Sequence, residues 1–142
     1  MDTRIIQFGS AEYEAMLQLR KTALLEPIGV PFYYINPEKE KNDVFIGAFE
    51  SGNIIGCCVL TRLSPDLVQL RQMAVSALYQ GNGIGALVLS FAETVAKAHG
   101  FTTMMMHARD PVIEFYAKQG YEVFGEPFQE VGLGHHKMQK QL

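Results

Sequence analysis

Three glycines within five residues are the clearest candidate for a ligand site in this chain. The segment Gln80-Gly81-Asn82-Gly83-Ile84-Gly85 lies between a strand-like run, Val68 to Val75, and a stretch with the apolar spacing of a long amphipathic helix. Glycines allow an unobstructed turn whose backbone N–H groups can face an anion. The helix that follows adds free N–H groups and the positive end of its dipole. Together these features predict a phosphate cradle.

Two familiar phosphate-binding motifs fit the segment poorly. A P-loop needs Lys-Ser or Lys-Thr after its final glycine, whereas Gly85 is followed by Ala86-Leu87, so that motif is excluded. The spacing Gly81-x-Gly83-x-x-Ala86 formally matches the dinucleotide-binding pattern. That pattern opens a βαβ unit directly after a strand, but here five residues intervene and the preceding strands are predicted to form a meander. A dinucleotide-dependent oxidoreductase is therefore the weaker alternative.

The context of the glycine turn resembles the acyl-CoA signature of the GNAT superfamily of N-acyltransferases. Gln80-x-x-Gly83-x-Gly85 follows a Met73-Ala74-Val75 strand end and opens a helix. Further along, Phe115 to Tyr121 is similar to the family's FYxxxGF helix-to-strand ending, at the expected distance. The segment from Glu130 to Met138 looks like the ending of a bacterial subgroup of uncertain substrate. The meander, the two helices and the closing strands arrive in family order, so the resemblance covers essentially the whole chain.

The resemblance implies acetyl-CoA as the acyl donor. It places the pyrophosphate on the backbone N–H groups of the glycine turn and the pantetheine arm along the end of the preceding strand. The implied contact residues are Met73, Ala74, Val75, Gln80, Gly81, Asn82, Gly83, Ile84, Gly85 and Tyr116. A backbone N–H near Val75 would be placed to stabilise the thioester oxyanion. The alternative is that the glycines serve only a tight turn.

Tyr116 matches the family tyrosine that acts as general acid. The resemblance implies that its hydroxyl protonates the CoA thiolate as it leaves. The alternative is that Val112, Phe115 and Tyr116 form the buried stripe of a short helix.

A general base is harder to locate from the sequence. The strand from Leu67 to Val75, where some family members carry their base, contains no carboxylate. His107, at the end of the strand expected beside it, is the next candidate catalytic residue. His135 and Glu130 follow. A histidine at a strand end is more often structural, and this alternative stays open for each.

The implied reaction is transfer of an acetyl or other acyl group to the amine of a small-molecule or peptide-like acceptor, by direct attack in a ternary complex. In the family, the region after the first strand covers the acceptor, which here points to Phe32, Tyr33 and Tyr34; packing against the sheet is the alternative. Many members have Asn seven residues before the tyrosine, where this chain has Arg109. That departure, and the lack of an obvious base, leave a non-catalytic acyl-CoA sensor as an alternative function.

The elements that position these residues follow from hydrophobic periodicity and turn residues. A strand is expected from Arg4 to Phe8, and Ser10 is expected to cap a helix running to about Leu25. The remaining expected elements are a helical turn at Glu38 to Lys41, strands at Val44–Phe49, Ile54–Leu63 and Leu67–Val75, a helix at Ile84–His99, a strand at Thr102–His107, a helix from Asp110-Pro111 to Lys118, and strands at Tyr121–Phe124 and His135–Lys140.

This order, β-α-(α)-β-β-β-α-β-α-β-β, predicts an α+β or mixed α/β fold in one domain spanning residues 1–142. The resemblance implies a mostly antiparallel central sheet of about six to seven strands with helices on both faces. In the third strand of the meander, Val68 and Leu70 are followed by Met73 and Val75. Leu70 and Met73 are three residues apart, whereas apolar residues on one face of a strand recur every two. This spacing predicts either a β-bulge or a strand that is buried on both faces.

Composition and charge limit the kinds of partner and cellular location that we expect for this protein. The chain has 142 residues and a net charge of −3, from 12 basic and 15 acidic residues, which argues against broad nucleic-acid binding. Its longest uncharged apolar run, Ile54 to Leu60, is too short to cross a membrane, and the N-terminus lacks a signal-peptide pattern, so we expect a cytoplasmic protein. Cys57 and Cys58 are adjacent, which predicts buried side chains rather than a disulfide framework. No metal is expected, and a homodimer stays open.

Overall fold

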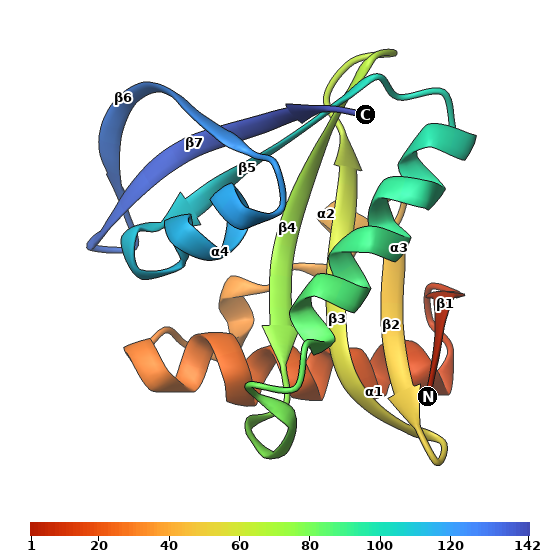
Figure 1. Cartoon of the computed structure of the whole chain (residues 1–142). Coiled ribbons are helices and arrows are strands. Elements are labelled where there is room, and N and C mark those ends of the chain that lie inside the picture. The colour runs from red at the N-terminus through yellow and green to blue at the C-terminus, as the bar shows by residue number, and fades with distance from the viewer.

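The computed structural model describes all 142 residues, and one seven-stranded sheet runs through it in the order β1-β2-β3-β4-β5-β7-β6 (Figure 1). The strands are β1 (Asp2–Ile6), β2 (Val44–Glu50), β3 (Asn53–Arg62), β4 (Leu67–Val75), β5 (Thr103–Arg109), β6 (Glu122–Glu130) and β7 (Leu133–Gln141). The helices are α1 (Ala11–Arg20), α2 (Pro37–Glu40), α3 (Ile84–Ala98) and α4 (Ile113–Lys118). Every pairing is antiparallel except the parallel one between β4 and β5. The α+β fold class is confirmed.

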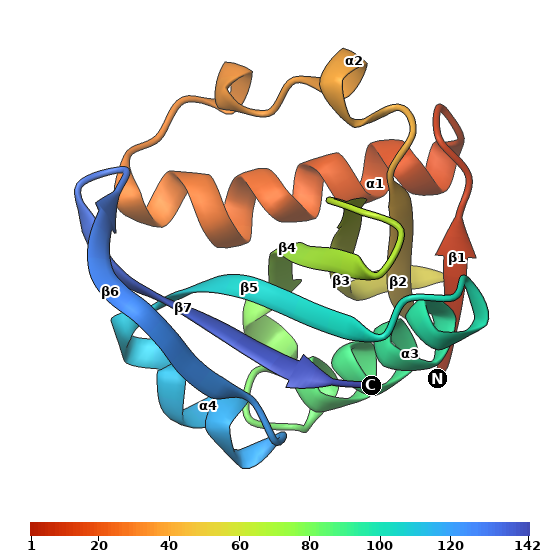
Figure 2. The same cartoon turned by 90° about the horizontal axis from the view of Figure 1, so that it is seen from above.

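Helices cover both faces of the sheet: α1 and α2 lie on one face, α3 and α4 on the other (Figure 2). Two apolar cores result, one under each layer. Cys57 belongs to the core under α1 and Cys58 to the core under α3, and both are fully buried. The adjacent cysteines therefore point to opposite faces of β3, as neighbouring residues of a strand must.

Local signals account for the two long helices. The Ser10 side chain accepts a hydrogen bond from the Tyr13 N–H at 3.1 Å, which caps α1 as predicted. The apolar residues of α3 recur every three or four positions and face the sheet. Gly56 on β3 allows close approach, because a Cβ there would lie 2.7 Å from Cγ2 of Ile84. No helix of the structure is long and apolar enough to span a membrane.

The irregularity predicted in β4 is a β-bulge. Arg71 pairs with Val59, and Ala74 pairs with Cys57, so two β4 residues stand opposite one residue of β3. Gln72, inside the bulge, has a φ of +57°, in the left-handed region that costs a non-glycine residue about 1–2 kcal/mol. This strained backbone must be held by its surroundings.

The two central strands separate beyond the bulge. β4 pairs with β5 over only four residues, Leu67 to Leu70 with Thr103 to Met106. From Arg71 onward the edge of β4 that faces β5 has no strand partner, and Figure 1 shows β4 and β5 diverging there. The parallel pairing arises because α3 carries the chain across the sheet between the two strands.

Several element boundaries differ from the sequence prediction by two residues or more, and three of them have a clear physical reason. The first strand ends at Ile6 rather than Phe8, because the Ser10 N–H bonds the Gln7 carbonyl at 3.2 Å and closes a turn. The first helix is regular only to Arg20 and continues as a π-helical segment, Lys21–Leu25. The strand expected at Tyr121–Phe124 extends to Glu130, because an edge strand tolerates a proline at an irregularity in its pairing.

Candidate active site

A cavity of about 750 Å³ occupies the gap where β4 and β5 diverge. Its walls come from the diverging parts of both strands, the N-terminus of α3, helix α4 and the end of β6. The π-helical segment and the loop after it close the side that faces α1. Of its 28 lining residues 18 are hydrophobic, so the few polar groups are the ones able to orient a ligand.

The glycine turn lies at one end of the cavity. The cavity wall there includes Gln80, Gly81, Ile84 and Gly85, whereas Asn82 and Gly83 lie outside it. Gly81 and Gly83 have φ values of +84° and +78°, and a Cβ at either position would meet nothing within 4 Å. Gly83 stands at the N-cap of α3, where its carbonyl accepts the Leu87 N–H at 3.1 Å. The N–H groups of the first turn are left without helical partners. This arrangement fits a phosphate.

Two residues of the turn have additional roles. The Asn82 N–H donates to the Tyr79 carbonyl at 3.3 Å, so this predicted donor is already engaged within the protein. A Cβ at Gly85 would lie 3.3 Å from the ring of Phe115, so this glycine lets α3 and α4 approach each other. The Gln80 side chain reaches back to the Val75 carbonyl at 3.4 Å and ties the turn to the end of β4.

Met73, Ala74 and Val75 line the same cavity along the unpaired edge of β4. A strand edge without a partner is a template for an extended polar chain, because its free N–H and C=O groups face outward. The predicted pantetheine tract and the predicted cradle therefore belong to one continuous space.

Tyr116 lies on α4 and faces this space, with 6% of the residue exposed. Burial, and secondarily the neighbouring Cys58, raises the pKa of Tyr116 well above its ordinary value of 10. The phenol therefore stays protonated and can act as a proton donor. Its neighbour Tyr121 donates a hydrogen bond to Glu93 at 2.8 Å, whereas the Tyr116 hydroxyl donates to no carboxylate.

The three base candidates of the sequence lie together in the cavity wall. His107 Nδ1 is 3.0 Å from Oε1 of Glu130, and His135 Nε2 is 3.6 Å from its Oε2. The Phe128 ring packs edge-on against His107 and stacks on His135, with centroids 5.0 and 5.5 Å apart. Strand β6 thus supplies both residues that contact His107 of β5, Glu130 and Phe128.

These contacts determine which nitrogens are available. A carboxylate can only accept, so His107 Nδ1 donates to Glu130, and the lone pair of the neutral ring lies on Nε2. His135 Nδ1 donates to the Leu133 carbonyl at 2.8 Å in the same way. A carboxylate that orients an imidazole and leaves Nε2 free is the usual arrangement of a histidine general base.

Only one of the three aromatic residues predicted to lie beside the acceptor is in the cavity wall. Tyr34 lines the cavity, but Phe32 and Tyr33 do not and are exposed. The apolar wall comes instead from an earlier part of the chain: Ala23, Leu24, Leu25, Ile28 and Val30. The helix predicted to run to about Leu25 includes Leu24, but nothing local indicated that the end of this helix turns toward the cavity.

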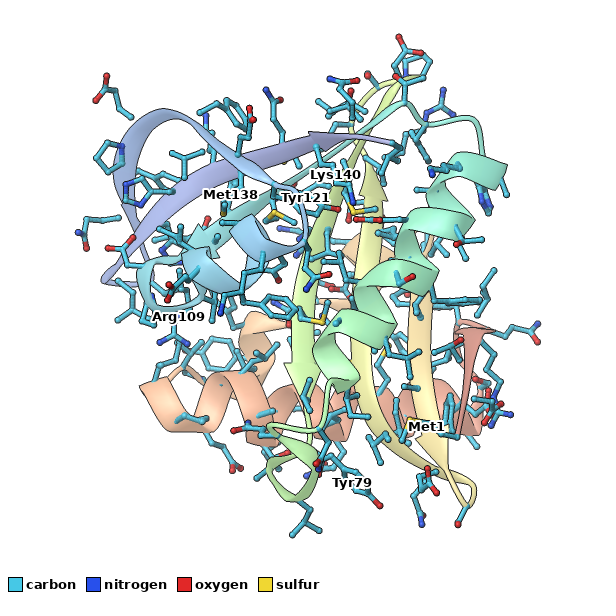
Figure 3. The ribbon with its side chains drawn as sticks, in the orientation of Figure 1. Met1, Tyr79, Arg109, Tyr121, Met138 and Lys140 are labelled. Atoms are coloured by element: carbon cyan, nitrogen blue, oxygen red, sulfur yellow. The ribbon has the colours of Figure 1, made fainter.

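Two arginines also line the cavity. Arg109 lies at the end of β5, between α4 and the helical segment that follows α1 (Figure 3), and it forms no ion pair. Arg71, in the bulged part of β4, was not singled out from the sequence. Its Nη1 donates to Thr61 at 3.3 Å and lies 3.7 Å from Asp43. No group of three or more His, Cys, Asp or Glu side chains is arranged to hold a metal ion.

A buried ion pair contacts the bulge of β4 on the side of the sheet that α1 and α2 cover. Arg20 of α1 and Glu40 of α2 are fully enclosed and bond through two contacts, of 2.6 and 3.0 Å. Arg20 Nε also donates to Oε1 of Gln72 at 3.1 Å. The residue with the strained backbone is thereby anchored to both N-terminal helices.

The fold and the site define an acyltransferase-like architecture, and comparison with known proteins identifies the family. The model of the Acetyltransferase (GNAT) family matches residues 13–121. The chain belongs to this family. The match includes the bulged strand, the glycine turn and Tyr116.

Curated relatives come from bacteria. An uncharacterized N-acetyltransferase of Bacillus subtilis, YitI, is 30% identical over 97 residues, which are 64% of this chain and 65% of the relative. A putative acetyltransferase of the same organism is 25% identical over 130 residues, 87% of this chain and 86% of the relative. The uncharacterized protein YyaT, also from B. subtilis, is 27% identical over 81 residues, which are 57% of this chain and 55% of its own length.

Solved structures share the fold along the whole chain. A putative N-acetyltransferase from Lactobacillus plantarum has a TM-score of 0.89 at 23% identity, with 100% of this chain and 99% of that chain covered. An aminoglycoside 6'-N-acetyltransferase complexed with coenzyme A has a TM-score of 0.83 at 14% identity, with 99% and 97% covered. An Elizabethkingia anophelis GNAT acetyltransferase with acetyl-CoA bound has a TM-score of 0.77 at 19% identity, with 99% and 97% covered.

Proposed function

We propose that the chain is an N-acetyltransferase that moves an acetyl group from acetyl-CoA to the amine of a small-molecule or peptide-like acceptor. One observation carries the proposal. A single cavity joins the glycine turn, the free edge of β4, the protonated Tyr116 and the oriented His107. Donor and acceptor entering from opposite sides of the sheet would meet where β4 and β5 part.

The donor fits the α3 side of this cavity. Open backbone at Gly81 and Gly83 suits the pyrophosphate, since a helix N-terminus offers unpaired N–H groups and a positive dipole end. The free edge of β4 suits the amides of the pantetheine arm. Family relatives that carry coenzyme A or acetyl-CoA in their structures support this choice.

The acceptor fits the α1 side, where His107, Glu130 and the apolar wall lie. Its neutral amine attacks the thioester carbonyl carbon, His107 Nε2 accepts the amine proton, the C–S bond breaks, and Tyr116 donates its proton to the leaving sulfur. At pH 7 the α-amino group of a peptide is neutral in roughly one molecule in ten and a lysine-like amine in roughly one in 2,500. A single histidine therefore suits an amine of the α-amino kind best.

Release of CoA thiol from acetyl-CoA, measured across a panel of amines, tests the proposal. His107→Gln should lower kcat on the order of 100-fold or more, because it removes the base. His136→Gln is the matched control: its Nδ1 is 2.9 Å from Asp110, another histidine–carboxylate pair, but it lies outside the cavity. The control should keep wild-type activity. A thermal shift with acetyl-CoA but no thiol release with any amine would instead favour the sensor.

A further inference from the structure

A small polar side pocket opens beside the acceptor part of the cavity. Its volume is about 130 Å³, and it shares Tyr34, Arg71 and Gln72 with the main cavity. Only two of its eight lining residues are hydrophobic. A pocket of this size can hold a carboxylate with a water molecule or two. Its polarity contrasts with the apolar wall next to it, so the two surfaces suit different parts of one ligand.

The charges around the side pocket do not cancel. Three cations surround it, Arg20, Lys39 and Arg71, while the carboxylates are Glu40 and the adjacent Asp43. Arg20 is committed to Glu40 and to the bulge. One positive charge is left in excess, in a chain whose net charge is −3. A local surplus of positive charge attracts a ligand that carries a negative charge.

Arg71 is the group able to bind such a ligand. All of its recorded contacts with protein groups go through Nη1, to Thr61, Asp43 and Glu40. Nη2 and Nε have no protein partner, and the side chain is 37% exposed toward the cavities. A guanidinium with one edge free offers two parallel N–H donors, the geometry that a carboxylate accepts.

The main cavity disfavours a highly cationic acceptor. Its lining contains two arginines, Arg71 and Arg109, and one carboxylate, Glu130, which already binds His107. An acceptor with several ammonium groups would place like charges together without counter-ions. The remaining wall, from Leu24 to Val30, is mostly apolar and suits a hydrocarbon side chain.

Resting on the proposed function, we propose that the acceptor is a small apolar amine that carries a carboxylate, as an apolar amino acid does, and that Arg71 binds this carboxylate. Arg71 directly follows Leu70, the last β4 residue paired with β5. The carboxylate is thus held next to the point where the strands part, and the amine a few ångströms away faces His107. Arg71 sets specificity by orienting the acceptor, while the acetyl donor lies on the opposite face.

Matched acceptors test the carboxylate. L-leucine, 3-methylbutylamine (the same amine without its carboxylate) and an aminoglycoside are compared by thiol release at saturating acetyl-CoA. We expect leucine to exceed 3-methylbutylamine in kcat/KM by more than the difference in their neutral amine fractions, and Arg71→Gln to remove that excess. Arg71→Gln should raise the KM for leucine about 10- to 100-fold, the effect of losing a charge-assisted bidentate contact, with the KM for acetyl-CoA unchanged. Arg62→Gln, an exposed arginine of β3 that lies outside both pockets, should behave as wild type.

The outcomes separate this inference from the function it rests on. If 3-methylbutylamine or the aminoglycoside is acetylated as well as leucine, or if Arg71→Gln keeps the full wild-type preference for leucine, the carboxylate site is refuted while the enzyme stands. Calorimetric titration of leucine into CoA-saturated protein supplies a readout without turnover. Binding that Arg71→Gln abolishes, with no thiol release from any amine, would support the carboxylate site and overturn the acetyltransferase. Melting temperatures of all variants exclude misfolding as the cause.

Discussion

Removing the charge of Glu40 should destabilise the fold strongly, because Arg20 would then be buried without a counter-ion. Arg20 is 0% exposed and Glu40 3% exposed, so water screens neither charge. Loss of one partner of a buried pair costs about 3–5 kcal/mol, and Glu40→Gln should lie near about 3 kcal/mol since the amide oxygen still accepts one hydrogen bond. At about 3–4 °C per kcal/mol for this chain length, the melting temperature should fall by about 10 °C.

The control is the neighbouring acid of the same helix. Glu38 is 80% exposed, and its pair with Lys41 is 3.7 Å long, so Glu38→Gln should stay within about 0.5 kcal/mol of wild type. Both variants are measured by urea and thermal unfolding at pH 7. If Glu40→Gln unfolds at the wild-type midpoint, the buried pair is not what holds these helices together.

A double variant separates stability from positioning. Replacing both Arg20 and Glu40 by methionine removes the charges together, and buried pairs replaced by apolar residues are often neutral or stabilising. Stability should therefore recover relative to Glu40→Gln. The hydrogen bond to Gln72 is still lost, so the β4 bulge loses its anchor, and kcat/KM should stay below wild type. A double variant that regains full activity would show that the bulge does not need Arg20.

Three further predictions follow from the site. Gly83→Val should lower acetyl-CoA affinity at least about 10-fold, whereas Gly52→Val, with a φ of +82° and the same open space, should show only the backbone cost of about 1–2 kcal/mol; calorimetry that finds equal affinity in both variants would contradict the cradle. Tyr116→Phe should lower kcat by a similar factor at every pH from 6 to 9.5, because the raised pKa keeps Tyr116 protonated throughout. A loss that disappears above pH 9 would contradict the raised pKa, and an unchanged kcat at every pH would contradict its role as an acid. Burial raises the pKa of Cys57 to about 12 and that of Cys58 well above its ordinary value, so a thiol reagent at pH 8 should modify two groups only after denaturation; rapid labelling of the native protein would be inconsistent with their burial.

The features that sequence reasoning located are encoded locally. The Ser10 cap, the glycine turn and the change in apolar spacing before Met73 each depend on residues that are close together in the sequence. The features it missed depend on contacts between distant segments. Arg20 and Glu40 are 20 residues apart, and nothing in either neighbourhood indicates that they pair.

The acceptor side shows the same limit. His107, Glu130 and His135 were each candidates, but their association depends on how far β6 extends. The sequence Gly125-Glu126-Pro127 is typical of a loop, yet the edge position lets the strand continue past it. That continuation brings Glu130 to His107. The apolar wall of the acceptor side was missed because the apolar residues between Ala23 and Val30 do not show, from their spacing, which surface of the protein that segment covers.

The four-residue ladder between β4 and β5 also bears on how the chain folds and opens. It is the only strand pairing that joins β1–β4 to β5–β7, and Leu67 and Thr103 are 36 residues apart in the sequence. Closing so long a loop costs chain entropy before the short ladder returns any hydrogen bonds, whereas the hairpins on either side form from near neighbours. We therefore expect the amides of this ladder to exchange with solvent before those of β2 and β3. The short β4–β5 pairing leaves room for two substrates. It also divides the sheet into two cooperative units, β1–β4 and β5–β7, that are only weakly connected.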